Sequence, residues 1–498
     1  MPHPPNVLFI MVDQWPGALL GSAGHPVIQT PTLDHLARLG TRYPRAYAEC
    51  PICIPARRSV MTGTSPRGHG DRNFAPALPM PALPTLAQRF RDGGYQAYAV
   101  GKMHLYPQRD RIGFDDILLA EEGRAQLGAV DDYDMYLAEQ GAAGEQYLHG
   151  MNNNDYLHRP WHLPERLHVT NWTTREAARM IKRRDPRRPA LWHVSYTHPH
   201  PPLVPLAAYL DLYGRDAIDL PARAAWEQRW DQDADAMPPA LRSIREHWPI
   251  GDDPARLRAI RRAFYALCSH IDHQLRVLLG TLREEGLLDD TVILFCGDHG
   301  DMLGDFGLWA KRLFYEGSAR VPMILVGAAG DARVPAGQVD ERLVGLQDVM
   351  PTLLSLAGLP VPATVEGLPM TGERRRDILY GECKEDRLAT RMAHDGRHKL
   401  IWYPAGNVVQ LFDLQADPRE CRDLSEAAQY ALIRQRLEQA LVERAWGVDR
   451  DWISAGRLTG FPAPAAPPRA DRQFGGQRGL HYPQPPLSDP TQTVGSPG

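Results

Sequence analysis

Four apolar or largely apolar runs, each followed by polar residues, constrain the fold of this chain more than any other feature. They span residues 7–12, 95–101, 190–196 and 291–296. Such runs are typical of strands buried on both faces of a parallel sheet, and helical patterns lie between them, so they predict an α/β fold. Open α/β sheets bind ligands at the carboxyl ends of their strands. The polar residues that follow the runs are therefore candidate functional residues. Between the last two runs, apolar residues from Leu257 to Leu282 recur at three- and four-residue steps, which predicts a long amphipathic helix with His270 and His273 on its polar face.

Each of these strand ends carries residues with useful chemistry. The residues that follow the first, second and fourth runs are Asp13 and Gln14, Lys102 and His104, and Asp298 and His299. A carboxylate beside an imidazole is a plausible metal-binding pair, although an isolated Asp is more often a helix cap or a turn residue. His200 follows the third run among prolines. Prolines restrict the backbone, which suits a proton donor that must keep its place.

A cysteine segment lies between the first two runs. Cys53 has an arginine, Arg57, four residues later, and a thiolate near an arginine is a possible nucleophile. Cys50 and Cys53 also form a Cys-x-x-Cys pair, which is compatible with half a zinc site or a redox pair. Neither alternative is well supported, because no second Cys-x-x-Cys follows and the remaining cysteines are single, at 268, 296, 383 and 421.

Taken in order, these segments resemble the signature motifs of the sulfatase family. Cys53, Pro55 and Arg57, followed by Thr62-Gly63, are similar to its Cys-x-Pro-x-Arg motif, although Ala56 and Met61 stand where Ser and Leu are usual. The other similar segments contain Asp13, the run 66–73 with Asn73, Gly101-Lys102-x-His104, His200, the run 297–305 with Asp298 and His299, and Lys311. Asp13-Gln14 is most similar to choline-sulfatase-like and phosphonate-monoester-hydrolase-like members.

The resemblance implies a fold, a modified residue and a metal. The fold is alkaline-phosphatase-like, a mixed, mostly parallel sheet between helices with a small antiparallel C-terminal α+β domain. A formylglycine-generating enzyme is expected to oxidise Cys53 to formylglycine. One divalent cation is expected to bind Asp13, Asp298, His299 and residue 53, with Gln14 where a second Asp is common. Because Gln14 is neutral, it is expected either to bind the cation weakly through its carbonyl oxygen or to form hydrogen bonds nearby. Oxygen ligands favour Ca²⁺, the preferred ion, or Mg²⁺, and the imidazole admits Mn²⁺ as an alternative.

The resemblance also implies the roles of the remaining site residues. Arg57 is expected to hold the hydrated aldehyde, while Lys102 and Lys311 neutralise the sulfuryl oxygens and Asn73 contacts them. His104 is expected to act as the base and His200 as the acid that protonates the leaving alcohol. These two histidine roles are interchangeable at this stage, because a sequence gives no distances.

The predicted activity is hydrolysis of a small sulfate ester to inorganic sulfate and an alcohol. The first alternative is a phosphonate monoester or phosphodiester hydrolase that uses the same site. The second alternative is a non-enzymatic thiol or metal-binding protein, in which Cys53 is never converted.

The chain of 498 residues is long for one compact core. We expect a catalytic domain at 1–370, a small domain at 371–450 and an extended tail at 451–498. The tail is rich in Pro, Gly, Arg and Gln, which cannot build a core. It is either disordered or an arm that binds a neighbouring subunit of a homodimer or homotetramer through Phe461, Phe474, Tyr482 and Leu487.

Charge and hydropathy limit which binding partners and which cellular compartment we expect. The net charge of −4, with both signs interspersed, argues against nucleic acid and against an anionic membrane as a partner. The first apolar run is too short to span a bilayer and lacks a basic leader and a cleavage site. Six irregularly spaced cysteines do not form a disulfide framework. We therefore expect a cytoplasmic protein without a membrane anchor.

Overall fold

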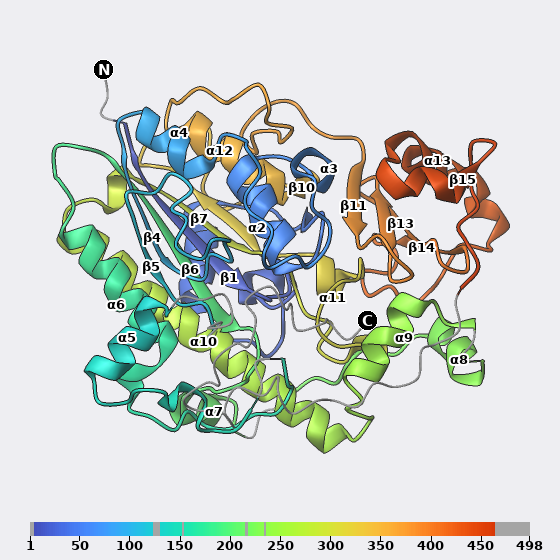
Figure 1. Ribbon diagram of the computed structural model, residues 1–498, viewed down its shortest axis with the longest axis horizontal. Helices are drawn as coiled ribbons and strands as arrows, with labels where there is room; N and C mark the ends of the chain where they lie inside the picture. Colours follow the sequence, from blue (N-terminus) through green and yellow to red (C-terminus); the bar gives the residue numbers. More distant parts are fainter. Residues whose placement is uncertain (1–3, 123–129, 152–153, 215–217, 234–235, 464–498) are drawn as a thin grey trace.

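A central eight-stranded sheet organises the larger part of the chain in a computed structural model. The structure describes residues 4–463 except 123–129, 152–153, 215–217 and 234–235. In spatial order the strands are β5 (Asp116–Leu119), β4 (Gln96–Gly101), β6 (Ala190–Pro199), β1 (Asn6–Asp13), β7 (Thr291–Gly297), β8 (Met323–Val326), β2 (Thr41–Arg42) and β9 (Gln338–Val339). The four apolar runs of the sequence thus form β1, β4, β6 and β7 (Figure 1).

The sheet is mixed and mostly parallel, as predicted. β1 runs parallel to β6 on one side and to β7 on the other, and β4 runs parallel to β6 and β5. β8 is antiparallel to both β7 and β2. Because β4, β6, β1 and β7 share one direction, their carboxyl ends meet at the same edge of the sheet.

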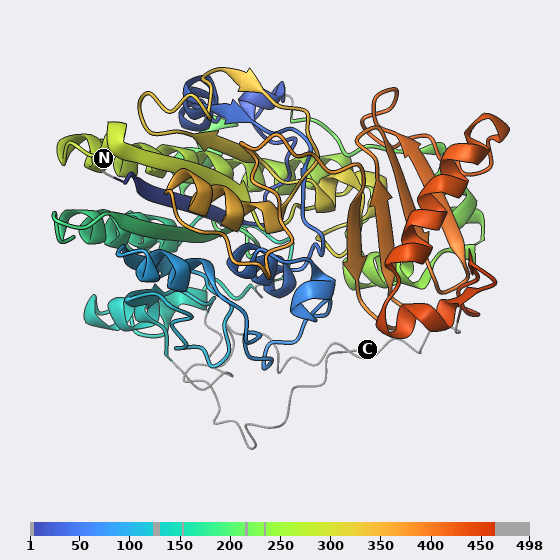
Figure 2. The same cartoon turned by 90° about the horizontal axis from the view of Figure 1, so that it is seen from above.

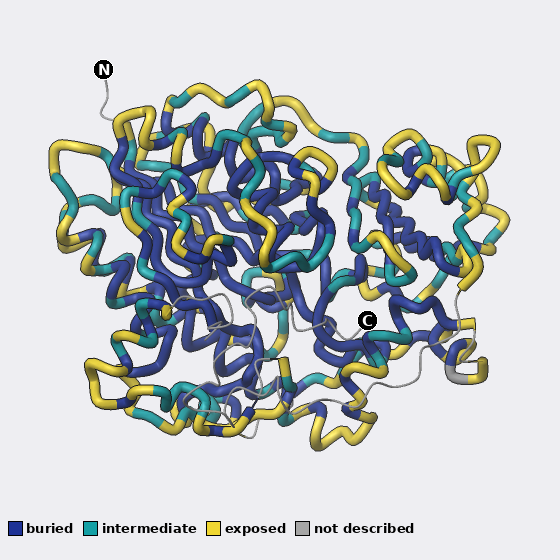
Figure 3. Tube along the Cα trace, viewed as in Figure 1, coloured by how far each residue is buried: buried dark blue, intermediate teal, exposed yellow. Residues whose placement is uncertain are grey.

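Helices cover both faces of this sheet, so it is buried along its length (Figures 1 and 3). On one face Leu8, Ile10 and Val12 pack with residues of α6 (Val169–Lys182) and α10 (Pro254–Glu284). On the other face Val7, Phe9 and Met11 pack with α2 (Cys53–Thr62), α4 (Leu86–Asp92) and α12 (Val349–Leu356). Other α-helices in the described part of the chain before residue 370 are α1 (Pro31–Leu39), α3 (Pro66–His69), α5 (Asp132–Glu139), α7 (Ala207–Leu212), α8 (Ala225–Gln232), α9 (Pro239–His247) and α11 (Glu316–Ala319).

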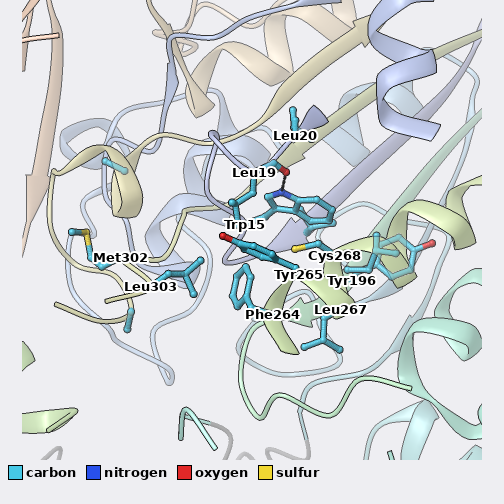
Figure 4. Packing of buried hydrophobic residues seen from close by; sticks show 14 of the residues in the cluster. Trp15, Leu19, Leu20, Tyr196, Phe264, Tyr265, Leu267, Cys268, Met302 and Leu303 are labelled. Carbon is cyan, nitrogen blue, oxygen red and sulfur yellow. Dashed lines mark hydrogen bonds between the residues drawn. The ribbon is translucent and has the colours of Figure 1, made fainter. Parts of the chain in front are cut away.

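The aromatic core beside the end of β1 fixes the loop that follows the strand. Trp15 is fully buried among apolar side chains, including Tyr265 of α10, and its indole N–H donates a hydrogen bond to the Leu19 carbonyl at 2.8 Å (Figure 4). Asp13 is the last residue of β1, and Gln14 is the first residue of this loop. The burial of Trp15 therefore holds two candidate site residues in place.

Helix α10 corrects one sequence-based expectation. The spacing of its apolar residues predicted that His270 would lie on a polar face, but His270 is fully buried. Its Nε2 lies 2.6 Å from Asn171 Oδ1 on α6, and its ring stacks on Tyr209 of α7.

Among the described residues, no helix combines the length and the apolar character that a membrane span requires.

A second, four-stranded sheet stands beside the large one (Figure 2). Its antiparallel strands are β11 (Leu379–Cys383), β12 (Thr390–His394), β13 (His398–Tyr403) and β14 (Val408–Asp413), and α13 (Ala431–Arg444) packs on one face. This is the small antiparallel C-terminal unit that the resemblance implied.

Residues 453–461 differ from the extended tail that we expected from 451 onward. β15 (Ile453–Ser454) and β16 (Arg457–Leu458) form a hairpin that contacts α13. The Phe461 ring lies 5.3 Å from Trp452, and the Phe461 backbone bonds to residues 404 and 406. Phe461 is thus an anchor within its own chain, because the hairpin returns it to the small sheet. Phe474, Tyr482 and Leu487 lie outside the described residues.

Buried charges join the two sheets. Arg72, which follows α3, bonds Glu382 of β11 at 2.9 Å and Asp449 at 2.8 Å, and Arg391 of β12 bonds the same Asp449. We call Arg72, Glu382, Arg391 and Asp449 the interdomain cluster. A further buried cation, Lys399 of β13, bonds Glu316 of α11 at 2.6 Å. The small sheet is thereby held in a fixed position against the catalytic core.

Candidate active site

The candidate site forms where three segments meet at the carboxyl edge of the sheet. Asp13 ends β1, and Asp298 and His299 directly follow β7. β1 and β7 are adjacent and parallel, with Val12 opposite Gly297, so their ends lie side by side. Cys53 is the first residue of α2, and the helix N-terminus favours negative charge at that position.

Four of the predicted metal ligands form one buried group. One ligand atom from each of Asp13, Cys53, Asp298 and His299 lies within 4.8 Å of the others. His299 Nε2 is 3.1 Å from Cys53 Sγ, 3.7 Å from Asp13 Oδ1 and 3.6 Å from Asp298 Oδ1. We call these four residues the ligand group.

The orientation of His299 suits metal binding through one nitrogen. Its Nδ1 lies 3.0 Å from the Gly300 carbonyl, which places a proton on Nδ1. Nε2 is then the atom that faces the other ligands. A hydrogen bond from the second ring nitrogen to a carbonyl is the usual way in which proteins orient a metal-binding histidine.

Arg57 supports the carboxylates of the ligand group from within α2. Its Nε donates to Asp298 Oδ2 at 3.0 Å, and its Nη2 lies 3.5 Å from Asp13 Oδ2. Its Nη1 donates to the Lys102 carbonyl at 2.6 Å and to Ser195 Oγ at 2.8 Å. The guanidinium therefore fixes both carboxylates and the end of β4 at once.

Lys102 enters the site at the end of β4 because the residue before it is glycine. Gly101 has φ of +106°, and a Cβ there would lie 1.8 Å from the Ser195 carbonyl oxygen. The fully buried Lys102 Nζ forms ion pairs with Asp13 Oδ2 and, at 2.8 Å, with Glu122 Oε1. The lysine thus bridges the ligand group and a second carboxylate.

Lys311 reaches the site through Gln14. Its Nζ donates to Gln14 Oε1 at 2.6 Å. Gln14 Nε2 donates to Asp301 Oδ2 at 2.6 Å and to the Tyr156 hydroxyl at 3.0 Å. Gln14 was expected either to bind the cation weakly or to form hydrogen bonds nearby, and the hydrogen bonds are present; its contact with a cation stays a prediction.

The two predicted acid–base histidines are both buried. The His104 backbone, with φ of +58°, donates its N–H to Glu121 Oε1 at 2.9 Å. His200 Nδ1 lies 2.7 Å from the Pro201 carbonyl and 3.4 Å from Glu122 Oε1. Asn73 instead directs its amide to Glu385 Oε2 at 3.1 Å, so its contact with a substrate stays a prediction.

Sequence reasoning missed several residues of this site. They are Ser195, Glu121, Glu122, Tyr156 and Asp301. Asp301 lies in the run 297–305 that resembles the family signature, and this was the one available signal. The other four become visible only when the chain is folded.

The electrostatics of the site favour anions at its centre. Burial alone would raise the pKa of Asp13, but Lys102, His200, Lys311 and His299 together hold it well below its usual value. Burial and Asp13 would raise the pKa of the Cys53 thiol, yet the pKa is lowered because the surrounding cationic groups, which include Lys311, Lys102 and His299, act together. Burial and Lys311 hold the pKa of His200 well below its usual value, so its ring is neutral in the ligand-free site.

Cys50 does not take part in this site. Its thiol points to the Arg72 carbonyl at 3.6 Å, whereas the Cys53 thiol points to His299 and Asp13. Burial and a contact with Cys383 raise the pKa of Cys50 well above its usual value. Both Cys50 and Cys53 are free thiols, so the two do not form a disulfide.

The ligand group fits a divalent cation. Two buried carboxylates and one imidazole with a correctly placed Nε2 are suitable ligands, and like charges this close require compensation. Among the described residues, Asp13 Oδ2 accepts no well-aligned hydrogen bond, although it lies beside Lys102. A cation bound by the ligand group would compensate the charge of the Asp13 and Asp298 carboxylates.

The fold and the site define a hydrolase of the alkaline phosphatase superfamily, and comparisons with known proteins identify the family. The family model described as Sulfatase matches residues 5–359, and one for the C-terminal region of N-sulphoglucosamine sulphohydrolase matches residues 304–446. The chain belongs to the sulfatase family.

The proteins similar to this chain include hydrolases of sulfate and phosphonate esters. An arylsulfatase of Clostridium perfringens is 33% identical, over 92% of this chain and 98% of its own. A choline-sulfatase of Rhizobium meliloti is 32% identical, over 85% and 82%. The crystal structure of a phosphonate monoester hydrolase of Agrobacterium radiobacter superposes with a TM-score of 0.71 at 26% identity, over 88% of this chain and 95% of its own.

Proposed function

We propose that this enzyme hydrolyses small sulfate monoesters, with residue 53 as formylglycine and one divalent cation in the ligand group. The observation that carries the proposal is the meeting of buried carboxylates and buried cations at residue 53. Asp13, Asp298 and His299 supply a cation site, and Lys102 and Lys311 supply positive charge for an anionic ester.

The chain's own residues account for binding and for proton transfer. Arg57 keeps both carboxylates of the ligand group in position through ion pairs at 3.0 and 3.5 Å. Lys102 and Lys311 stabilise the negative charge that develops on the sulfuryl oxygens. When the S–O bond breaks, its electron pair stays on the leaving oxygen, and His200 Nε2 delivers the proton. A bound anion favours the protonated ring, which offsets the low pKa of His200 in the ligand-free site.

The proposal includes a cofactor and a maturation step. Ca²⁺ is the preferred cation, with Mn²⁺ or Mg²⁺ as alternatives, since the ligands are mainly oxygens with one imidazole. When bound, the cation and the hydrated aldehyde supply a polarised hydroxyl nucleophile at residue 53. A formylglycine-generating enzyme is the expected partner, because the encoded residue is cysteine.

A specific observation also favours a second activity on phosphonate monoesters or phosphodiesters. Gln14 is uncharged and bonds Lys311, which leaves the ligand group with two carboxylates. The similarity to a phosphonate monoester hydrolase covers most of the chain. We therefore propose sulfate esters as the main substrates and phosphorus esters as slower ones.

A kinetic panel tests the proposal. Converted enzyme is assayed with an aryl sulfate, choline sulfate, phenylphosphonate monoester and a phosphodiester, and released sulfate or phosphonate is measured directly. The proposal predicts the highest kcat/KM for one of the two sulfate esters. A clear preference for the phosphorus esters would instead make the second activity the main one.

We also propose that the mature protein is a cytoplasmic homo-oligomer whose chain beyond residue 463 contacts a neighbouring subunit. Truncation after residue 463 keeps the Phe461 anchor of the small sheet. The truncated protein should have a smaller mass in solution at unchanged thermal stability. An unchanged oligomeric mass would contradict this role.

A further inference from the structure

Glu122 is a buried carboxylate inside the site that has no assigned role. It follows β5, only 7% of its surface is exposed, and its backbone has φ of +56°. A non-glycine residue in the left-handed region is strained and persists where its surroundings require it. Glu122 Oε1 lies 2.8 Å from Lys102 Nζ and 3.4 Å from His200 Nδ1. One oxygen therefore contacts both a predicted anion-binding residue and the predicted acid.

The surroundings of Glu122 identify the side of the site on which it acts. A cavity beside the ligand group is lined by Glu122, His198 and His200 and by the rings of Tyr133, Tyr147 and Trp161. No residue of the ligand group lines it. The sulfuryl group has to lie against the ligand group and the lysines, so an alcohol part that extends past His200 would meet this cavity. Glu122 would then act on the leaving-group side of the site, through His200.

The geometry at His200 shows what the carboxylate can do there. Nδ1 donates to the Pro201 carbonyl at 2.7 Å, and Glu122 Oε1 stands on the same edge of the ring. Nε2 is then the nitrogen available to the leaving oxygen. Because the Nδ1 proton goes to the Pro201 carbonyl, Glu122 acts on the ring through its charge: a carboxylate 3.4 Å from Nδ1 stabilises the protonated imidazole and favours the ring position that keeps Nδ1 beside it.

We propose that Glu122 is a positioning residue, which orients His200 toward the leaving oxygen and holds Lys102 against Asp13. It is not expected to transfer a proton to the substrate, because Lys102 and His200 occupy the oxygen that faces the site. This inference rests on the proposed function, since it concerns the ester that the same site cleaves.

The proposal has a consequence that depends on the alcohol. Proton donation matters most when the leaving alcohol is a poor leaving group, and very little for a good one such as a nitrophenol. Loss of the Glu122 charge should lower kcat for alkyl sulfates by about 10- to 100-fold, as is usual for a residue that orients a functional histidine. For nitrophenyl sulfate the loss should stay below about fivefold, since little proton transfer is needed.

The test compares Glu122→Gln, Glu122→Asp and wild type with a series of sulfate esters that differ in the pKa of the alcohol. Glu139→Gln, at an exposed position on α5, is the matched control. The proposal predicts a steeper dependence of kcat on alcohol pKa for Glu122→Gln, partial recovery in Glu122→Asp, and wild-type behaviour in the control. Thermal unfolding and bound-metal content of all variants should match.

Either of two results would overturn the proposed role of Glu122. An equal loss on all esters would give Glu122 a purely structural role. A lower KM in Glu122→Gln without a change of slope would mean that its charge only opposes substrate binding. If the wild type cleaves only phosphorus esters, the same series is run with those esters, and failure of the sulfatase proposal is then separate from failure of this one.

Discussion

Two buried groups of charges in this molecule have different arrangements. In the interdomain cluster every cation is matched by carboxylates, as with Arg72, which bonds Glu382 at 2.9 Å and Asp449 at 2.8 Å. In the candidate site Arg57 and Lys102 also pair with carboxylates, but Asp13 and Asp298 gather in one ligand group, and Lys311 bonds only a neutral amide oxygen among the contacts of the described residues. Matched charges fasten two parts of a protein together, whereas gathered like charges indicate a site that binds ions.

The largest effect should come from the residue at the centre of the site. Cys53→Ala should reduce hydrolysis to background, because we propose residue 53 as the nucleophile. Cys50→Ala is the control, and it should keep most of the activity, since Cys50 points away toward the Arg72 carbonyl. Initial rates and circular dichroism of both variants check this. Equal loss of activity in both variants would support a paired-thiol site instead.

Removal of the cation should have the next largest effect. A chelator should lower kcat/KM by at least about 10²-fold, because the cation polarises the nucleophile. It should also lower the free energy of unfolding by about 3 kcal/mol relative to protein with cation at 100 times its Kd. Activity and thermal melts with and without added Ca²⁺, Mn²⁺ or Mg²⁺ check this. Two equivalents of metal per chain would contradict the single site.

A pair of lysine variants tests the contrast between the two kinds of charge group. Lys311→Met should lower kcat/KM by about 10²–10³-fold, as loss of one donor to a developing anion does, with little change in stability. Lys399→Met should leave kcat/KM nearly unchanged and lower the free energy of unfolding by about 3–5 kcal/mol, because Glu316 and Glu420 would stay buried without their partner. Urea unfolding and steady-state kinetics measure both quantities. The contrast fails if Lys399→Met mainly affects turnover.

The smallest effect concerns Glu49, which lies near the connection between the two parts. Burial and the neighbouring Asp348 raise the pKa of Glu49 from 4.5 to about 7. Because the pKa is higher in the folded state, this group's contribution to stability is complete below about pH 4.5 and is lost as the pH rises through about 7.

Glu49→Gln removes this titration. The unfolding free energy of the wild type should fall by at most about 3 kcal/mol more than that of the variant between pH 5 and pH 8. Urea unfolding at both pH values checks this. Parallel pH dependences in the two proteins would show that Glu49 does not titrate in this range.

Much of the fold and the centre of the site could be predicted from the sequence. Asp13, Lys102 and Asp298 each follow an apolar strand, and parallel strands bring their ends together. The family resemblance added Cys53 and Arg57, which lie on a helix and carry no such signal. Local pattern and motif were sufficient here because each residue has a fixed position relative to a strand or a helix start.

Other parts could not be predicted, because they depend on contacts between distant segments. Glu122 lies in a stretch without clear periodicity, and only the packing of β4 beside β5 brings it to Lys102. Tyr156 meets Asp301 across 145 positions of sequence. His270 was wrongly expected on a polar face, since α6 and α7 cover a part of α10 that apolar spacing alone leaves open.

The most direct test of the central claim is a mass measurement of the peptide that contains residue 53, made on preparations with different degrees of maturation. Coexpression with a formylglycine-generating enzyme at several levels provides these preparations, and each is also assayed for sulfate release. We expect the specific activity to rise in proportion to the fraction of peptide that carries the aldehyde or its hydrate, from background at zero conversion. Full activity in a preparation whose peptide still carries the cysteine thiol would contradict the account.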